Sequence, residues 1–413
     1  MTSEEEKQVT EYMHFIIQEI CDTIGPRPPC SPEEAKCASY IEDHLKENAN
    51  ETAIEEFFCH PGSYRAQFEI PVVSLISITI FYWFYFYFQS IIFLILPLCI
   101  LTASLLVIFT NIMRNIEFID PVFKNEPSTN VFGKFKPKDA IKRRIVIGGH
   151  HDSNWEYPIL RKSWKLLGFL MAFPVILNYL FFAIFIIKLL LHFFSIYYLF
   201  ISSVDLALLI FLTILIPVLI FWAFNIVSDR PIMGANDNLT SIAVILAIAS
   251  RLKSLDLKST EVWLVSHGCE EIGDRGSKRF SQKYYPELKD AFIINIDMIG
   301  GKNTQLRFIT AEVIFLVKLS QGIATELAAI AQELNIPYQM GMIEAFTDSM
   351  AYAQNKIRAC SIIGFTEKGI PAHYHTREDT IEKLDFRNLW DCYQILLKFI
   401  KKVDNGEILQ KIE

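Results

Sequence analysis

The clearest chemical groups in this chain are two adjacent carboxylates, Glu270 and Glu271, in the stretch SHGCEEIGDRGS at residues 266–277. The apolar run VWLV before them predicts a buried strand, and the glycines around them predict a tight loop. Because neighbouring side chains at a strand end diverge, one carboxylate could bind a metal ion while the other handles protons. A Glu-Glu pair is ordinarily a solvated surface turn, so the metal interpretation depends on further ligands elsewhere.

Further side chains of the kind that bind metals follow other apolar runs. They are His150 with Asp152, Asp237, Asp297, and His375 with Asp379. Each has a structural alternative, because a His-x-Asp pair can simply hydrogen-bond to itself and a loop Asp often caps a turn or a helix. Taken together, two histidines and three carboxylates match the ligands of a pair of zinc ions bridged by one carboxylate.

The order of these motifs resembles that of the zinc aminopeptidases of peptidase family M-28, a family that also includes glutaminyl cyclases and transferrin-receptor-like pseudopeptidases. The matching motifs are GGHHDS, GANDN, EEIGDRGS, NIDMIG and YHTREDT. The resemblance covers nearly all of the polar part of the chain. It implies an α/β fold, a three-layer α/β/α zinc-peptidase domain with a mixed central sheet. The apolar helical hairpins that we expect to be inserted into this domain are a departure from the soluble members of the family.

The resemblance also implies seven functional residues. They are His150 and Asp297 as ligands of one zinc ion, Glu271 and His375 as ligands of a second, Asp237 as the ligand that bridges both, Glu270 as the general base, and Asp152 as the carboxylate that orients His150.

Departures from the family pattern are modest and remove none of these ligands. They are His151 where Tyr is frequent, Ser241 and Cys30 where Gly is usual, and Asn236 where Asp is frequent. His373 lies two residues from His375 and could compete for the metal, but the HTxxDT pattern favours His375.

The activity implied by the resemblance is hydrolysis of N-terminal peptide bonds, an aminopeptidase reaction in which Glu270 takes a proton from water and returns it to the leaving amine. One alternative is another zinc amidohydrolase, which would cyclise N-terminal Gln or deacylate a lipid amide. A cyclase would be expected to use a single metal ion. A second alternative is a non-catalytic binding module, but such modules typically lose ligands, and all of them are present here.

Composition separates the chain into polar and apolar parts. Of its 413 residues 52% are hydrophobic, and two nearly charge-free blocks account for the excess. We therefore expect a catalytic domain formed by residues 1–69, 111–165 and 228–413, and two hairpins at 70–110 and 166–227. The net charge of −7 without a basic block argues against a nucleic-acid partner. Eight scattered cysteines without a CxxC pair predict neither a disulfide scaffold nor a zinc finger.

The apolar blocks predict four membrane spans, at about 71–88, 91–110, 166–187 and 206–227, each long enough for a hydrocarbon core of roughly 30 Å. Residues 188–205 carry Lys188, His192 and Asp205, and we expect them to form an interfacial or re-entrant piece. Because both blocks interrupt one domain, each must cross the membrane an even number of times.

The charges that flank the spans predict an orientation. The basic residues on the domain side are Arg65, Arg114, Arg161, Lys162, Lys165 and Arg230, against little more than Lys188 on the other side. The positive-inside rule then places the catalytic domain in the cytoplasm, and the acidic start MTSEEEKQV predicts no cleavable secretory signal. Asp152 precedes Leu166 by 14 residues, so we expect an active site near the bilayer and membrane-associated substrates.

Periodicity in the polar part predicts alternating helices and strands. The expected helices cover about 4–22, 32–45, 313–334, 349–355 and 386–402, with another after GANDN. The expected strands cover 54–58, 66–70, 145–147, 291–296 and 360–365, and a further strand region begins near residue 130. Ser31 is the expected N-cap of the second helix, with Pro32 as its first residue.

Overall fold

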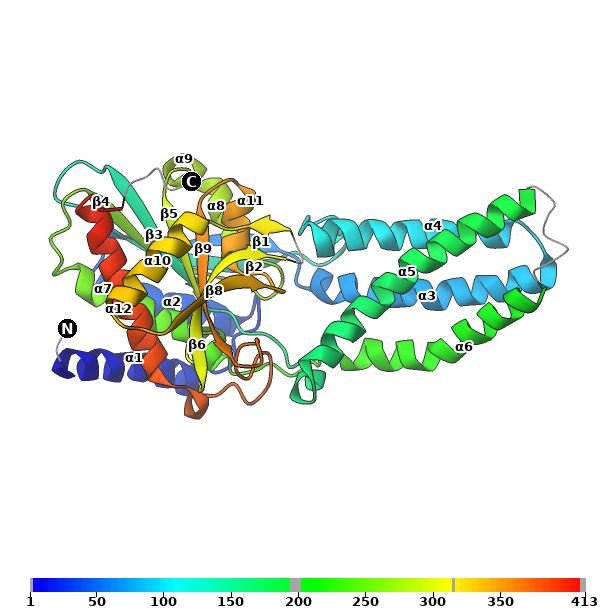
Figure 1. The fold of residues 1–413 in the computed structure, drawn as a ribbon, viewed down its shortest axis with the longest axis horizontal. Coiled ribbons are helices and arrows are strands. Elements are labelled where there is room, and N and C mark those ends of the chain that lie inside the picture. The colour runs from blue at the N-terminus through cyan, green and yellow to red at the C-terminus, as the bar shows by residue number, and fades with distance from the viewer. Residues whose placement is uncertain (1–2, 194–201, 314–315, 409–413) are drawn as a thin grey trace. The chain divides into compact units, whose positions relative to one another are not determined.

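A computed structural model describes residues 3–193, 202–313 and 316–408 (Figure 1). The chain forms two compact units. The sheet unit consists of Met1–Cys59, Asn125–Glu156 and Asp229–Glu413, and the helical unit consists of His60–Lys124 and Tyr157–Ser228. Each unit is therefore assembled from segments that are separated in the sequence.

The sheet unit is built around one mixed sheet of nine strands in the order β1-β2-β4-β3-β5-β9-β6-β7, with β8 paired to β6. The strands are β1 (Glu51–Cys59), β2 (Glu126–Phe135), β3 (Arg143–His150), β4 (Thr260–His267), β5 (Phe292–Asp297), β6 (Thr304–Glu312), β7 (Val317–Lys318), β8 (Tyr338–Ile343) and β9 (Ala359–Thr366). The central strands β4, β3, β5 and β9 are parallel. Strand β2 pairs antiparallel with β4, β6 pairs antiparallel with β9, and β1 pairs antiparallel with β2 at the edge.

Helices cover both faces of this sheet. One layer contains α1 (Ser3–Thr23), α2 (Pro32–Lys46), α7 (Thr240–Leu252), α10 (Gln321–Glu333) and α12 (Phe386–Asp404), and the other contains α8 (Arg275–Lys283), α9 (Tyr285–Leu288) and α11 (Asp348–Gln354). Alternation along β3 reflects the two layers, because Ile145 and Ile147 pack into the first layer's core and Val146 into the second's. The predicted mixed sheet between two helical layers is confirmed.

Most predicted elements of the sheet unit are present with small shifts in their ends. The predicted N-cap is confirmed, since Ser31 Oγ accepts the Glu34 backbone N–H at 3.1 Å. Two predictions were wrong. Residues 66–70, predicted as a strand, lie in a helix of the helical unit, and a five-residue alternation cannot by itself distinguish strand from helix. The helix predicted from residue 313 begins only at Gln321, where Ser320 is its N-cap.

The helical unit contains four long apolar helices. They are α3 (Gly62–Phe88), α4 (Ile92–Val107) with a π-helical continuation (Ile108–Met113), α5 (Trp164–Phe193) and α6 (Ser202–Asn225). By length and composition, four helices in the described residues could cross a membrane. Their apolar side chains are packed around a common core that includes Leu75, Leu94, Phe181 and Leu212.

The region predicted as an interfacial piece, residues 188–205, is helical at both described ends. Lys188 lies in α5 and Asp205 lies in α6, while residues 194–201 lie outside the described part of the chain, and the interfacial position of this region stays a prediction. The two charged side chains form a buried ion pair with each other, and Tyr82 Oη of α3 donates to Asp205 Oδ1 at 2.6 Å. A pair that satisfies its own charges allows both helices to continue past these residues.

Candidate metal centre

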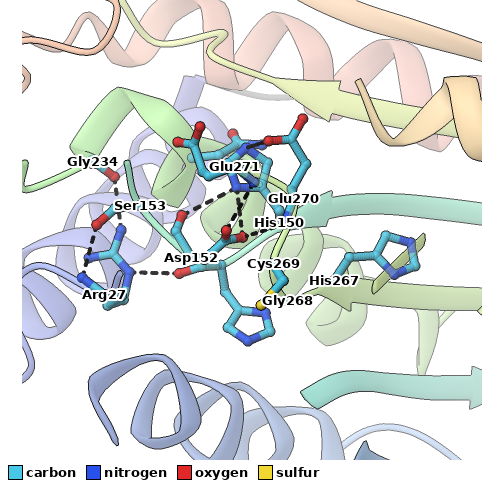
Figure 2. A network of polar contacts seen from close by, with 12 residues as sticks. Arg27, His150, Asp152, Ser153, Gly234, His267, Gly268, Cys269, Glu270 and Glu271 are labelled. Atoms are coloured by element: carbon cyan, nitrogen blue, oxygen red, sulfur yellow. Dashed lines mark hydrogen bonds and ion pairs between the residues drawn. The ribbon is translucent and has the colours of Figure 1, made fainter. Parts of the chain in front are cut away.

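The site lies at the carboxyl ends of the parallel strands. His150 is the last residue of β3, Asp297 is the last residue of β5, and the loop with Glu270 and Glu271 follows β4. In the ladder, His150 pairs with His267 at the end of β4. Because parallel neighbours end at the same edge, these side chains from distant parts of the sequence meet there. Figure 2 shows His150 beside Glu270 and Glu271.

The loop after β4 is held by Asp152, whose two carboxylate oxygens accept backbone N–H groups. Oδ1 accepts from Glu270 and Oδ2 from Glu271, both at 3.1 Å. The turn also needs a glycine at position 276, because a Cβ there would lie 2.3 Å from the carbonyl oxygen of Gly268. These contacts fix where the two glutamate side chains begin.

Asp237 lies in the loop before α7, and Asp379 positions this loop. Asp379 Oδ1 accepts the Asn236 N–H at 2.6 Å, and Oδ2 accepts the Asp237 N–H at 3.0 Å. Gly234 has a φ of +63°, and a Cβ there would lie 2.3 Å from the Asp237 carbonyl oxygen, so the approach to the loop requires glycine.

The structure brings the five expected ligands together in two groups that share Asp237. In one group, His150 Nε2 lies 3.4 Å from Asp237 Oδ1 and 3.6 Å from Asp297 Oδ1. In the other, His375 Nε2 lies 3.2 Å from Asp237 Oδ2 and 3.1 Å from Glu271 Oε2. Asp237 thus faces one histidine with each of its oxygens, as a bridging carboxylate would.

The two remaining site residues lie beside these groups. Glu270 Oε2 is 3.8 Å from His150 Nε2. On the opposite side of the imidazole ring, His150 Nδ1 is 3.3 Å from Asp152 Oδ1 and 3.2 Å from the Asp152 carbonyl oxygen. All seven residues expected from the sequence are buried in this one region.

The donor set fits a metal ion. Among the described residues, the buried atoms His150 Nε2, Glu271 Oε1 and Asp297 Oδ1 have no hydrogen-bond partner. Buried polar atoms are rarely left unpaired, and these belong to the residue types that bind zinc. One metal ion in each group would provide partners for them.

Electrostatics lead to the same conclusion. Burial, together with the charge of Asp237, raises the pKa of Glu271 to about 7. Burial also raises the pKa of Glu270 well above its ordinary value, although the neighbouring His150 opposes this. For Asp237 the burial effect is outweighed by hydrogen bonds with His150 and His375, which lower its pKa. So many carboxylates in one buried space require compensating positive charge.

Two other histidines lie outside these groups. His151 Nδ1 is hydrogen-bonded to Ser266 Oγ at 2.8 Å, and burial lowers the pKa of His151 to about 3. His373 is half-buried, and its Nδ1 lies 3.3 Å from Glu378 Oε2. Within the described residues, neither belongs to a cluster that could hold a metal ion.

The sequence interpretation missed other polar residues of the site. Asn154 Nδ2 donates to Glu271 Oε2 at 2.6 Å and lies 3.1 Å from His375 Nε2. Asp274, Glu312 and Asp348 are buried carboxylates, and burial raises the pKa of Glu312 to about 8 and that of Asp348 to about 7. Asp274 lies within the EEIGDRGS motif, whereas no local pattern distinguishes the other three.

Known proteins of solved structure share this fold. One solved structure of similar fold is a Zn-dependent exopeptidase from Parabacteroides distasonis, with 14% identity and a TM-score of 0.54 over 95% of this chain and 97% of the other. Another is an aminopeptidase from Aneurinibacillus sp., with 16% identity and a TM-score of 0.53 over 95% of this chain and 93% of the other. A glutaminyl cyclase from Bacteroides thetaiotaomicron is similar to the same degree, with 14% identity and a TM-score of 0.55 over 95% of this chain and 97% of the other. No curated protein matches the chain. Residues 222–400 match the model of peptidase family M28, and this match supports a hydrolase of the metallopeptidase type.

Proposed function

We propose that the chain is a membrane-anchored dinuclear zinc aminopeptidase, which removes N-terminal residues from peptides. The observation that carries this proposal is the position of Asp237 between two ligand groups, with His150 and Asp297 on one side and Glu271 and His375 on the other. Two such groups provide for two metal ions bridged by one carboxylate.

The residues around the ligands support hydrolysis. Zinc bound at this site would polarise the substrate carbonyl and lower the pKa of a bound water molecule. Glu270 accepts the proton of the attacking water and delivers it to the leaving amine, a role that suits a buried carboxylate with a raised pKa. Asp152 holds His150 in the orientation that directs Nε2 toward the carboxylates.

The four apolar helices of the helical unit support anchoring in a bilayer. We place the sheet unit in the cytoplasm, on the basis of the basic residues that flank the spans. Peptides that are hydrophobic or membrane-associated are then the expected substrates. We expect vesicles that contain the enzyme to hydrolyse a peptide with an acyl-chain anchor at its carboxyl end faster than the same peptide without this anchor.

The test uses the full-length protein in detergent with its bound zinc quantified. We expect about two zinc ions per chain and amino-acid release from unblocked peptides, but none from the same peptides with an acylated N-terminus. Glu270→Gln should retain the zinc and lose about 100- to 10,000-fold in turnover. Glu287→Gln, at an exposed position, is the matched control and should behave like the wild type.

Other outcomes would identify a different reaction. The fold is shared with glutaminyl cyclases, so the panel includes peptides that begin with Gln. Release of ammonia with formation of a pyroglutamyl end, together with one zinc ion per chain, would identify a cyclase. Hydrolysis of acylated substrates alone would identify an amidase, and the absence of both zinc and turnover would identify a binding module.

A further inference from the structure

Three cysteines from distant parts of the sheet unit meet at one point. Cys30 precedes α2, Cys59 ends β1, and Cys269 lies in the loop after β4. Sequence spacing could not show this cluster, because 29 residues separate the first two and 210 separate Cys59 from Cys269. In Figure 2, Cys269 directly precedes the two glutamates of the metal centre.

The three sulfur atoms form a nearly equilateral triangle. The Sγ–Sγ distances are 3.2 Å between Cys30 and Cys59, 3.4 Å between Cys30 and Cys269, and 3.4 Å between Cys59 and Cys269. A disulfide would need one pair to approach much more closely than the others, to an S–S distance of about 2.05 Å. A triangle with equal sides instead suits one ion bound to all three sulfurs at about 2.3 Å.

The backbone at two of these cysteines is held in an unfavourable conformation. Cys30 has a φ of 62° and Cys269 a φ of 53°, both in the left-handed region that most residues avoid. The buried carboxylate of Glu34 holds both in place, since Oε1 accepts the Cys269 N–H and Oε2 accepts the Cys30 N–H, each at 2.8 Å. Ligands held in advance by hydrogen bonds to their own backbone are typical of metal sites.

Burial also fits a metal-binding role. Cys59 and Cys269 are fully buried, whereas Cys30 is partly exposed. The cluster is therefore closed on the side of the protein core and reaches the surface at Cys30. Thiolates prefer zinc or monovalent copper to the harder cations that carboxylates bind.

We propose that Cys30, Cys59 and Cys269 bind one thiophilic d10 cation, Zn²⁺ or Cu⁺, at a site separate from the carboxylate and histidine centre. The cation stabilises the loop from which Glu270 and Glu271 extend, because one of its ligands is the residue immediately before them. This inference does not depend on the proposed reaction.

The test is a Co²⁺ titration of the full-length, metal-free protein in detergent under reducing conditions. Thiolate ligands give Co²⁺ a sulfur-to-metal charge-transfer band in the near ultraviolet, whereas histidine and carboxylate ligands give only visible bands. The wild type should show both kinds of band. Cys30→Ser and Cys59→Ser should each lose the ultraviolet band and keep the visible ones.

Cys37→Ser is the matched control, because Cys37 is a buried free cysteine of α2 outside the cluster, and it should keep both bands. Metal analysis of the protein as purified should find one zinc or copper ion more in the wild type than in Cys30→Ser, and the identity of that ion decides between the two metals. A wild type without the ultraviolet band, or variants that retain it, would overturn the proposal. A disulfide among the three cysteines in protein purified without reductant would also overturn it.

Discussion

At the scale of single residues, Asp152 contacts both the histidine and the glutamate loop of the candidate metal centre. Its carboxylate oxygens accept the N–H groups of Glu270 and Glu271, and Oδ1 also faces His150 Nδ1 at 3.3 Å. An acceptor at Nδ1 favours the tautomer whose Nε2 carries the free lone pair, which is the form that binds a metal. One side chain thus contacts both His150 and the loop that bears Glu270 and Glu271, which the proposed metal centre needs in fixed positions.

We expect Asp152→Asn to weaken zinc binding by about 10- to 100-fold and to lower turnover, because an amide cannot accept both backbone N–H groups. Competition with a zinc chelator measures the affinity, and turnover at saturating zinc separates the two effects. Asp139→Asn, at an exposed position, is the control. Unchanged affinity in Asp152→Asn would show that Asp152 does not orient the ligands.

The sequence motifs point to all seven residues that the fold brings together, Asp152 included, but not to every polar residue beside them. Each ligand lies in a short motif, next to the apolar run of a buried strand or the glycines of a tight loop. Asn154 and Asp348 have no such local pattern, and they reach the site only because the fold places them there. The cysteine cluster is the extreme example, since its geometry exists only after β1, α2 and the loop after β4 have assembled.

At the scale of elements, the fully buried Arg27 joins three segments around the site. Its guanidinium donates to the carbonyl oxygens of His151 at 2.8 Å, Met233 at 3.0 Å and Gly234 at 3.1 Å, and also to that of Gly25. The segment before α2 is thereby tied to the loop after β3 and to the loop before α7. Figure 2 shows Arg27 beside Ser153 and Gly234.

We expect Arg27→Lys to lower the free energy of unfolding by about 3 kcal/mol, because an ammonium group cannot reproduce the planar fork and leaves buried carbonyl groups unpaired. Thermal unfolding in detergent followed by circular dichroism measures the effect. Arg387→Lys is the control, since the Arg387 side chain is 79% exposed. Equal melting temperatures for the two variants would contradict this role of Arg27.

His267 at the end of β4 makes stability depend on pH. Burial lowers its pKa to about 3, whereas in the unfolded chain the value is about 6.5. Between these values the unfolded chain binds a proton that the folded protein excludes. The contribution of His267 to the free energy of unfolding is therefore at its full value above about pH 6.5. It decreases as the pH falls toward 3, by about 2 kcal/mol between pH 7 and 5.

We expect His267→Gln to remove this part of the pH dependence. Urea unfolding of metal-free protein at pH 7 and pH 5 measures it, and the absence of metal prevents zinc release from contributing. The wild type should lose about 2 kcal/mol more than the variant over this range. An identical loss in both proteins would mean that His267 is already protonated in the folded state.

Strands in the middle of the sheet were easier to predict than those toward its β7 edge. The strands β3, β5 and β9 are continuous apolar runs because both of their faces are buried. Strand β8 was missed, since most of its side chains are at least partly exposed and its pattern is weak. Burial on both faces leaves a signal in the sequence that a solvated face does not.

At the scale of the whole molecule, the helical segments leave and rejoin the sheet unit at the same places. Cys59, where the chain leaves β1, pairs directly with Glu126, where it returns in β2. The second departure is similar, because the Glu156 N–H donates to the Arg230 carbonyl oxygen at 2.8 Å. If the four apolar helices span a bilayer, both insertions must begin and end on one side of it, and each must cross it an even number of times.

This reasoning predicts that the turn between α3 and α4 lies on the opposite side of the membrane from the sheet unit. In sealed vesicles, a thiol reagent that cannot cross the membrane should label Ser90→Cys and Ser254→Cys from opposite sides, each introduced into protein whose exposed Cys99 is replaced by Ala. Ser254 is an exposed residue of the sheet unit and Ser90 lies in the short connection between the two helices, so both substitutions are conservative. Labelling of both from the same side would mean that α3 and α4 do not cross the bilayer, because a hairpin that crosses it carries its turn to the far side. Ser90 on the far side and Ser254 in the cytoplasm would agree with the charge distribution along the chain.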